Sequence, residues 1–199
     1  MNIIFDLGGV VFSWNPAQII QKVFILPDEQ RVIRTKIFEH PDWLDLDRGT
    51  LDRTQAIQRA IERTGFPPNR IEALFQQIPH ALVPIPETLE IVRQVKQAGH
   101  KCFVLSNMHV TSIEHLENEY PIWELFDGRV ISCYIHLLKP EPAIYQFILN
   151  KYNLRPEETI FIDDMEVNVQ AAAQLGLATI RFLSPAQFRE ALQHLGCLP

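Results

Sequence analysis

Short apolar runs alternate with longer amphipathic segments along the second half of the chain, and this alternation constrains the fold more than any other feature. Segments with helical periodicity stand between these runs. Strands that alternate with helices form a parallel sheet covered by helices on both faces. The apolar residues before Asp6 predict one more strand of the same doubly wound α/β sheet. The other runs, KCFVLSN, RVISCYI, TIFIDD and ATIRF, occupy residues 101–107, 129–135, 159–164 and 178–182.

Residues 15–84 interrupt this alternation, because their apolar positions repeat with helical spacing throughout. In residues 51–65, for example, an apolar face built from alanines and isoleucines ends at Gly65, a typical helix stop. We therefore expect two parts. Residues 1–12 and 85–199 form a Rossmann-like α/β core, and residues 13–84 form an all-helical cap inserted after the first strand. Pro140 is expected in the first turn of a later core helix.

Composition excludes several classes of partner. The 199 residues carry a net charge of -6 and no basic run, which argues against nucleic acid. The apolar runs fall far short of the ~20 residues that span a bilayer, so no membrane segment is expected. The chain enters its first strand at once, which predicts a cytoplasmic protein without a signal peptide. Cys102 and Cys133 lie in strand-like runs and are predicted to be buried, reduced thiols.

Polar residues follow the predicted strands at the points where the strands end. In open parallel sheets, ligands bind at this carboxyl edge. Three carboxylates there repel one another unless a cation is present, and hard oxygen ligands favour Mg²⁺. A lysine and a hydroxyl can hold an anion, so the set predicts phosphoryl transfer. The residues are Asp6, Ser106, Asn107, Lys139, Asp163 and Asp164.

Each of these residues also has an ordinary structural explanation. Taken alone, Asp6 fits a turn at the end of a strand, and Ser106 with Asn107 fits a helix cap. Lys139 fits the start of a helix, and Asp163 with Asp164 fits a solvated strand end. Their joint occurrence favours a site. Other polar and aromatic residues lie near the rim or in the cap. They either contact a substrate or only pack against neighbouring side chains, and packing is favoured for the histidines. These are Trp14, Trp43, Asp47, Arg48, His109 and His136.

Four short motifs in this order resemble the haloacid dehalogenase superfamily of aspartate-nucleophile hydrolases. They are FDLGGV, VLSN, KPEPAIY and FIDDMEVN, and they extend over nearly the whole chain. The predicted helical insertion is similar to the family's cap. Within the superfamily, the chain most resembles bacterial phosphatases of the α-D-glucose-1-phosphate type and the phosphatase domain of soluble epoxide hydrolases.

The resemblance implies a role for each matching residue. Asp6 is the nucleophile that becomes an aspartyl-phosphate, and Lys139 neutralises both Asp6 and the phosphate. Ser106 and Asn107 hold the phosphoryl oxygens together with Lys139. Asn168 orients Asp164 from one helical turn away. The implied Mg²⁺ ligands are Asp6, the backbone carbonyl of Gly8, Asp163 and Asp164.

Gly8 departs from the common family pattern, in which a second aspartate stands two residues after the nucleophile and protonates the leaving group. We expect the two glycines to let the chain turn so that a backbone carbonyl can face the metal. Without an acid at Gly8, phosphates with more acidic leaving groups are predicted to react faster. A cap residue or an ordered water remains an alternative proton donor. The residues before Lys139, His136 to Leu138, also differ from relatives, which often show a glycine and an arginine.

The predicted function is Mg²⁺-dependent hydrolysis of phosphomonoesters of small metabolites, with sugar phosphates as one candidate class. Two alternatives stay open: a metal-free hydrolase of the 2-haloacid dehalogenase type, and a catalytically silent binding protein. The acidic pair Asp163 and Asp164 disfavours the first, since a metal-free site has little use for it. A signalling receiver domain is set aside because its acidic pair follows the first strand. The substrate and the oligomeric state stay open.

Overall fold

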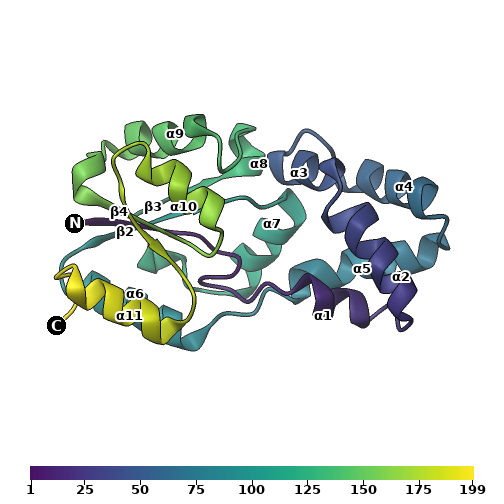
Figure 1. Cartoon of the computed structure of the whole chain (residues 1–199), viewed down its shortest axis with the longest axis horizontal. Helices are drawn as coiled ribbons and strands as arrows, with labels where there is room; N and C mark the ends of the chain where they lie inside the picture. The colour runs from purple at the N-terminus through teal and green to yellow at the C-terminus, as the bar shows by residue number, and fades with distance from the viewer.

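The computed structural model describes residues 1–199 and contains one five-stranded sheet with a helical bundle beside it (Figure 1). All strand pairs are parallel, and the strand order is β3-β2-β1-β4-β5. The predicted α/β fold is confirmed. The strands are β1 (Asn2–Phe5), β2 (Lys101–Ser106), β3 (Gly128–Ile131), β4 (Thr159–Asp163) and β5 (Ala178–Arg181).

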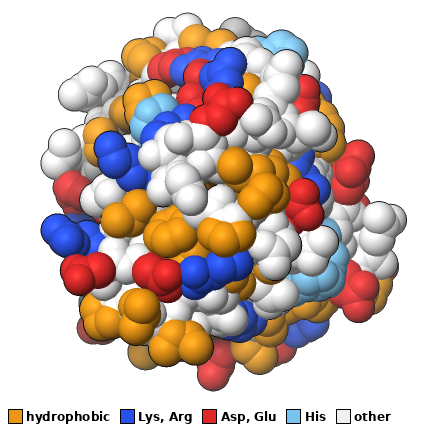
Figure 2. Space-filling model, turned by 90° about the vertical axis from the view of Figure 1, so that its right-hand side faces the viewer, with side chains coloured by type: hydrophobic (Ala, Val, Ile, Leu, Met, Phe, Trp, Pro, Cys, Tyr) orange, Lys and Arg blue, Asp and Glu red, His pale blue; other side chains and the backbone are white.

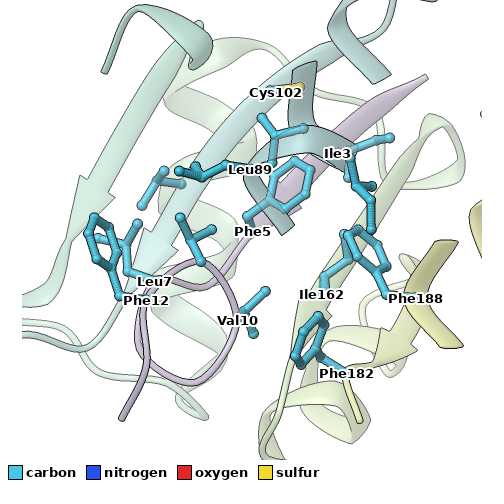
Figure 3. Close-up of a cluster of buried hydrophobic side chains, with 14 of the residues drawn as sticks. Ile3, Phe5, Leu7, Val10, Phe12, Leu89, Cys102, Ile162, Phe182 and Phe188 are labelled. Atoms are coloured by element: carbon cyan, nitrogen blue, oxygen red, sulfur yellow. The ribbon is translucent and has the colours of Figure 1, made fainter. Parts of the chain in front are cut away.

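Helices cover both faces of the sheet, because successive strand residues point to opposite sides. Ile3 and Phe5 belong to one apolar cluster, whereas Ile4 belongs to the cluster on the other face. Figure 3 shows Phe5 surrounded by side chains from the neighbouring strands, the following loop and the covering helices. The first cluster takes residues from α6 (Pro86–Gln97), α7 (Val110–Glu119) and α11 (Pro185–His194), and the second from α9 (Pro142–Tyr152) and α10 (Glu166–Ala173).

The insertion after β1 is entirely helical, as predicted, and has its own buried cluster drawn from residues between Ile19 and Ile78. In α4, Ala56 and Ala60 face this cluster, and Gly65 ends the helix in a left-handed conformation. Trp14 packs against both this cluster and the sheet's cluster. The helices are α1 (Pro16–Gln21), α2 (Pro27–Ile33), the π-helix η1 (Arg34–Phe38), α3 (Pro41–Arg48), α4 (Arg53–Thr64) and α5 (Pro68–His80).

Two sequence expectations near the third strand are wrong. The strand predicted over residues 129–135 stops at Ile131, and a short helix, α8 (Ser132–Ile135), follows. Tertiary contacts decide this, because the Ser132 hydroxyl donates to the Asp47 carbonyl from within α8. Pro140 lies before α9 rather than in its first turn, which Pro142 occupies. Two short 3₁₀ turns, η2 (Trp123–Leu125) and η3 (Pro156–Glu158), complete the connections.

The three cysteines are unpaired and buried, as predicted for Cys102 and Cys133, although Cys133 lies in α8 and not in a strand. Burial raises the pKa of both thiols to about 12, so they stay protonated. No helix combines the length and hydropathy that crossing a membrane requires. The outer end of the bundle mixes acidic, basic and apolar side chains, without a continuous area of one charge sign (Figure 2).

Candidate active site

Asp6 stands at the carboxyl edge of the central strand. Its backbone N–H donates to the carbonyl of Ile162, 3.0 Å away, which extends the pairing with β4 by one step. The side chain is only 7% exposed, and Oδ1 accepts a 2.7 Å hydrogen bond from the N–H of Leu7. Sheet pairing therefore fixes both the position and the direction of this carboxylate.

The two glycines after Asp6 differ in what they require. Gly9 has φ +82°, and a Cβ there would lie 2.5 Å from Oδ2 of Asp164, so only glycine fits. At Gly8 a Cβ would meet only the Trp14 Cβ at 3.8 Å, an ordinary contact. The expectation that both glycines serve the turn is therefore wrong for Gly8, whose position accommodates a side chain.

Lys139 joins two of the predicted carboxylates. Its Nζ lies 2.9 Å from Oδ1 of Asp6 and 2.7 Å from Oδ2 of Asp163, in a buried position. The Asn107 amide holds the backbone of Lys139 from both sides: Nδ2 donates to its carbonyl at 2.9 Å, and Oδ1 accepts from its N–H at 2.8 Å. Residues from the four motifs thus meet, as the sequence predicted, and the ammonium is fixed in place.

The two neighbouring aspartates have different surroundings. Asp163 is fully buried, and its oxygens accept from Lys139, from the N–H of Met165 at 2.8 Å and from the side-chain amide of Asn168 at 3.0 and 3.1 Å. Asn168 therefore orients Asp163, not Asp164 as expected. The reason is that α10 begins only at Glu166, so Asp164 is not one helical turn below Asn168.

Burial and like charge govern the protonation of this cluster. Burial raises the pKa of Asp6 well above its ordinary value, Lys139 opposes this, and Asp163 adds to it. Burial also raises the pKa of Asp164. Burial acts to lower the pKa of Lys139, but the charges of Asp163 and Asp6 outweigh this and raise the pKa above its ordinary value, so the ammonium stays charged. One fixed cation faces three carboxyl groups, which favours the binding of a further cation.

The donor set fits a magnesium ion. Asp6, Asp163 and Asp164 each offer an oxygen, and these atoms lie within 4.8 Å of one another. Asp164 is the acid whose oxygens are not taken up by Lys139 or Asn168, and it rests against the backbone at Gly9. Carboxylate and backbone oxygens are the ligands that Mg²⁺ prefers.

Ser106 is the last residue of β2 and Asn107 follows it, and their side chains are bonded differently. Ser106 is buried, and its hydroxyl has no hydrogen-bond partner, so it can still bind a ligand. The side-chain amide of Asn107 is already paired with Lys139, while the residue itself lines the cavity above Asp6. Asn107 thus positions Lys139, a function that the sequence did not suggest.

A cavity of about 320 Å³ extends between this edge of the sheet and the helical bundle. Asp6, Lys139 and Asp164 form its polar floor. The bundle side is mainly apolar, and sequence reasoning singled out only the two tryptophans and Asp47 there. Trp43 and Asp47 stand four residues apart on α3, a spacing that puts both on one helix face. The bundle side and its connections contribute Trp14, Trp43, Leu44, Asp47, Ile78 and Leu82.

Other rim residues have mostly structural surroundings. His109 is buried, caps α7 and packs edge-on against Trp43, as the packing alternative predicted. His136 and Arg48 bond to one another's backbones, and Arg48 also pairs with Glu141 at 2.5 Å. Neither His136 nor Arg48 lines the cavity. These contacts dock α3 onto the sheet part of the molecule.

The fold and the four motifs agree with a family of hydrolases built on such a parallel sheet. The family model for haloacid dehalogenase-like hydrolases matches residues 1–176. The chain belongs to this family and is therefore an enzyme of the hydrolase class.

Two curated relatives resemble the chain over most of its length. The sesquiterpene phosphatase astK of Aspergillus oryzae is 29% identical over 195 residues, which cover 98% of this chain and 96% of that protein. The (S)-2-haloacid dehalogenase 1 of a Pseudomonas species is 24% identical over 74% of this chain and 63% of its own.

A solved structure has the same fold. It is a HAD family enzyme of Bacteroides thetaiotaomicron in complex with magnesium and inorganic phosphate. It superposes with a TM-score of 0.72 at 23% identity, covering 90% of this chain and 92% of that one.

Proposed function

We propose that this protein is a Mg²⁺-dependent phosphatase that hydrolyses phosphomonoesters of small metabolites through an aspartyl-phosphate on Asp6. The observation that carries the proposal is the position of Lys139, which bridges Asp6 and Asp163. The carboxylate of Asp164 lies beside them and is not bonded to Lys139. An ammonium held there neutralises an incoming phosphate dianion close to the nucleophile. The similarity to a curated phosphatase over almost the full length supports the same reaction.

Each residue of the rim has a distinct task in this proposal. Asp6 attacks phosphorus along the line opposite the departing oxygen. Lys139 holds a phosphoryl oxygen and is kept in place by Asp163 and the Asn107 amide. The free hydroxyl of Ser106 donates to another phosphoryl oxygen. Asn168 acts through Asp163, whose carboxylate it orients.

The residues that would hold Mg²⁺ are Asp6, Asp164 and the backbone carbonyl of Gly8, with Asp163 adjacent. Bound there, the ion offsets the charge that develops on the phosphoryl oxygens. Asp163 already accepts four hydrogen bonds or ion pairs, which is about the full capacity of a carboxylate. Its contribution to the ion is therefore electrostatic, and the direct carboxylate ligands are Asp6 and Asp164.

The division of the chain into residues 1–12 with 85–199, and residues 13–84, assigns these tasks to two parts. The first part carries the nucleophile, Lys139 and the residues that would hold Mg²⁺. The second covers the cavity, excludes water and contacts the leaving group. The separate apolar cluster of the bundle supports this division.

Two substrate classes are candidates. Sugar phosphates follow from the subgroup that the motifs resemble. The cavity wall favours a second class, phosphates of apolar alcohols, because the side chains of Leu44, Ile78 and Leu82 offer no hydrogen-bond partner for sugar hydroxyls. The relative astK is named a sesquiterpene phosphatase, which agrees with an apolar leaving group.

A panel of substrates tests the function. It contains phenyl phosphate, a sugar 1-phosphate, an isoprenoid monophosphate and 2-chloropropionate, each assayed with Mg²⁺ and with EDTA. Release of phosphate that requires Mg²⁺ is expected, together with a lower KM for the apolar esters. Release of chloride in the presence of EDTA would overturn the proposal in favour of the dehalogenase alternative. Absence of turnover with every member would favour the silent binding protein.

A further inference from the structure

Asp47 is a buried carboxyl on the bundle side of the active-site cavity, and the tasks proposed above do not use it. It is 9% exposed and lines the same cavity as Asp6 and Lys139. It lies near the C-terminal end of α3, which packs against α8 where the bundle meets the sheet part (Figure 1). A buried carboxyl that faces a cavity and has no basic side chain bonded to it is costly unless it stays protonated.

The position of Asp47 is fixed by contacts on both sides of it. The Asp47 carbonyl accepts a 2.5 Å hydrogen bond from the Ser132 hydroxyl, which in turn accepts from the N–H of Met108 at 2.9 Å. Arg48 forms a two-point ion pair with Glu141. At Gly49, which has φ +77°, a Cβ would lie 2.4 Å from the Cys133 carbonyl, so glycine allows the close approach. Three consecutive residues thus dock this segment onto the sheet part.

The direction of the reaction places the leaving oxygen near the bundle. Displacement at phosphorus is in line, so the departing oxygen lies opposite Asp6. Asp6 stands on the floor of the cavity, and the bundle forms the opposite wall. On that wall, Asp47 is the titratable group among the lining residues; the others are apolar.

The other proton donors in the cavity fit the role less well. Lys139 is held by two carboxylates, which raise its pKa. Burial lowers the pKa of His109 to about 4, so it is neutral at pH 7, and its ring is bonded to Ser112. Asp164 is a proposed metal ligand. Gly8, where many relatives carry the acid, has no side chain.

We propose that Asp47 is the general acid and base that replaces the missing side chain at Gly8. This inference rests on the proposed phosphatase function. In the first half-reaction, a carboxylate oxygen of Asp6 bonds to phosphorus as the ester P–O bond breaks. The departing oxygen takes the Asp47 proton and leaves as the alcohol. In the second half-reaction, the Asp47 carboxylate takes a proton from a water molecule while the oxygen of that water bonds to phosphorus. The bond to Asp6 breaks, which releases phosphate and restores both residues.

The charged and titratable surroundings agree with a protonated Asp47. Burial raises its pKa to about 7, hydrogen bonds from the His109 backbone and from Trp43 oppose this, and the Asp6 charge adds to it. Lys139 lowers the pKa slightly, and Cys133 on α8 is the remaining titratable neighbour. A donor with a pKa close to the working pH serves both half-reactions well.

Two aspartates on α3 provide a matched experiment. Asp47→Asn keeps the shape and can still accept from the His109 backbone, but it has no acidic proton. Asp45→Asn makes the same change on a residue of α3 that does not line the cavity. Rates are measured with an alkyl phosphate and with 4-nitrophenyl phosphate, whose leaving group needs no proton. We expect Asp47→Asn to lose about 10²–10⁴-fold on the alkyl ester and little on the nitrophenyl ester. Asp45→Asn should match the wild type on both.

Two further variants keep the outcome decisive. Gly8→Asp in the Asp47→Asn background should regain alkyl phosphatase activity, since a side chain fits at Gly8. Asp6→Asn separates the two proposals. If Asp6→Asn is inactive while Asp47→Asn hydrolyses the alkyl ester at the wild-type rate, the inference about Asp47 fails and the proposed function stands. If Asp6→Asn stays active, the aspartyl-phosphate mechanism itself fails. An equal loss of both esters in a folded Asp47→Asn protein would also overturn the acid role.

Discussion

The two walls of the active-site cavity are built on opposite principles. On the sheet side, most charged groups are bonded to one another, as Lys139 is to Asp6 and Asp163, and Asp164 stands beside them. On the bundle side, apolar residues such as Trp43 and Leu44 form the wall, and Asp47 stands among them. The first arrangement fixes charges at the point of reaction, and the second excludes water and selects the leaving group. Changes on the sheet side and at Asp47 should therefore affect the chemical step, and changes at the apolar residues of the bundle side the choice of substrate.

The nucleophile gives the largest expected effect. Asp6→Asn keeps the size of the side chain but removes the attacking oxygen's charge, so kcat should fall by several orders of magnitude. Steady-state rates with phenyl phosphate measure this, and circular dichroism checks that the variant is folded. Retention of more than a tenth of the wild-type rate would contradict the role assigned to Asp6.

Metal dependence comes next and divides the sheet side further. EDTA should abolish activity and Mg²⁺ restore it, because three carboxyl groups cannot receive a phosphate dianion unaided. Asp164→Ala removes a proposed ligand and should raise the Mg²⁺ concentration needed for half-maximal activity. Asn168→Ala only loosens Asp163 and should raise it less. If the two variants need the same Mg²⁺ concentration, Asp164 has no special role in binding the ion.

The apolar residues of the bundle side should affect KM rather than kcat. Leu44 lines the cavity yet is 53% exposed, so Leu44→Ala removes an apolar contact with little loss of stability. We expect KM for an isoprenoid monophosphate to rise by up to about tenfold, with little change for a small polar phosphate. Leu26→Ala, an exposed leucine of the bundle outside the cavity, is the matched control. Equal effects on both substrates would remove the evidence for an apolar substrate.

The sheet side could be predicted from the sequence far better than the bundle side. Asp6, Lys139 and Asp163 follow predicted parallel strands, whose carboxyl ends lie along one edge of the sheet, so the pattern predicts that these residues come close together. The hydrogen bonds between them could not be predicted. The contact of the Asn107 side chain with the Lys139 backbone is one example. Asn168 bonds Asp163 in place of Asp164, because this contact depends on where α10 begins.

The bundle side depends on how its helices dock, which periodicity does not reveal. Helical spacing identifies Trp43 and Asp47 as sharing one face of α3. Whether that face meets the bundle's interior or the cavity depends on tertiary contacts, among them Gly49 against Cys133 and Ser132 against Asp47. The same contacts end the third strand early, at Ile131.

Asp47 also links the bundle side to pH. Its folded pKa of about 7 exceeds the ordinary 3.8, so folding takes up a proton between these values. The stability that this group contributes is present below about pH 4 and is lost as pH rises through about 7. Asp47→Asn does not titrate, so its Tm relative to the wild type should increase over this range and then level off. If the difference in Tm between Asp47→Asn and the wild type does not change with pH, the Asp47 carboxyl of the wild type has an ordinary pKa, and the prediction is wrong.

The smallest expected effect concerns the ion pair that joins the two walls. Arg48 and Glu141 are partly exposed, so a double-mutant cycle with Arg48→Met and Glu141→Gln should give a coupling below about 1 kcal/mol in urea unfolding.

Arg48 adjoins Asp47, and loosening Arg48 should misplace the proposed proton donor. We therefore expect a several-fold lower kcat on an alkyl phosphate and an unchanged kcat on 4-nitrophenyl phosphate. Arg59→Met, which removes an exposed ion pair to Asp42 within the bundle, is the control and should leave both rates unchanged. If Arg48→Met lowers kcat equally for both substrates, the contacts of Arg48 support the whole active site and do not act through Asp47 alone. The two walls would then not have separate functions where they meet.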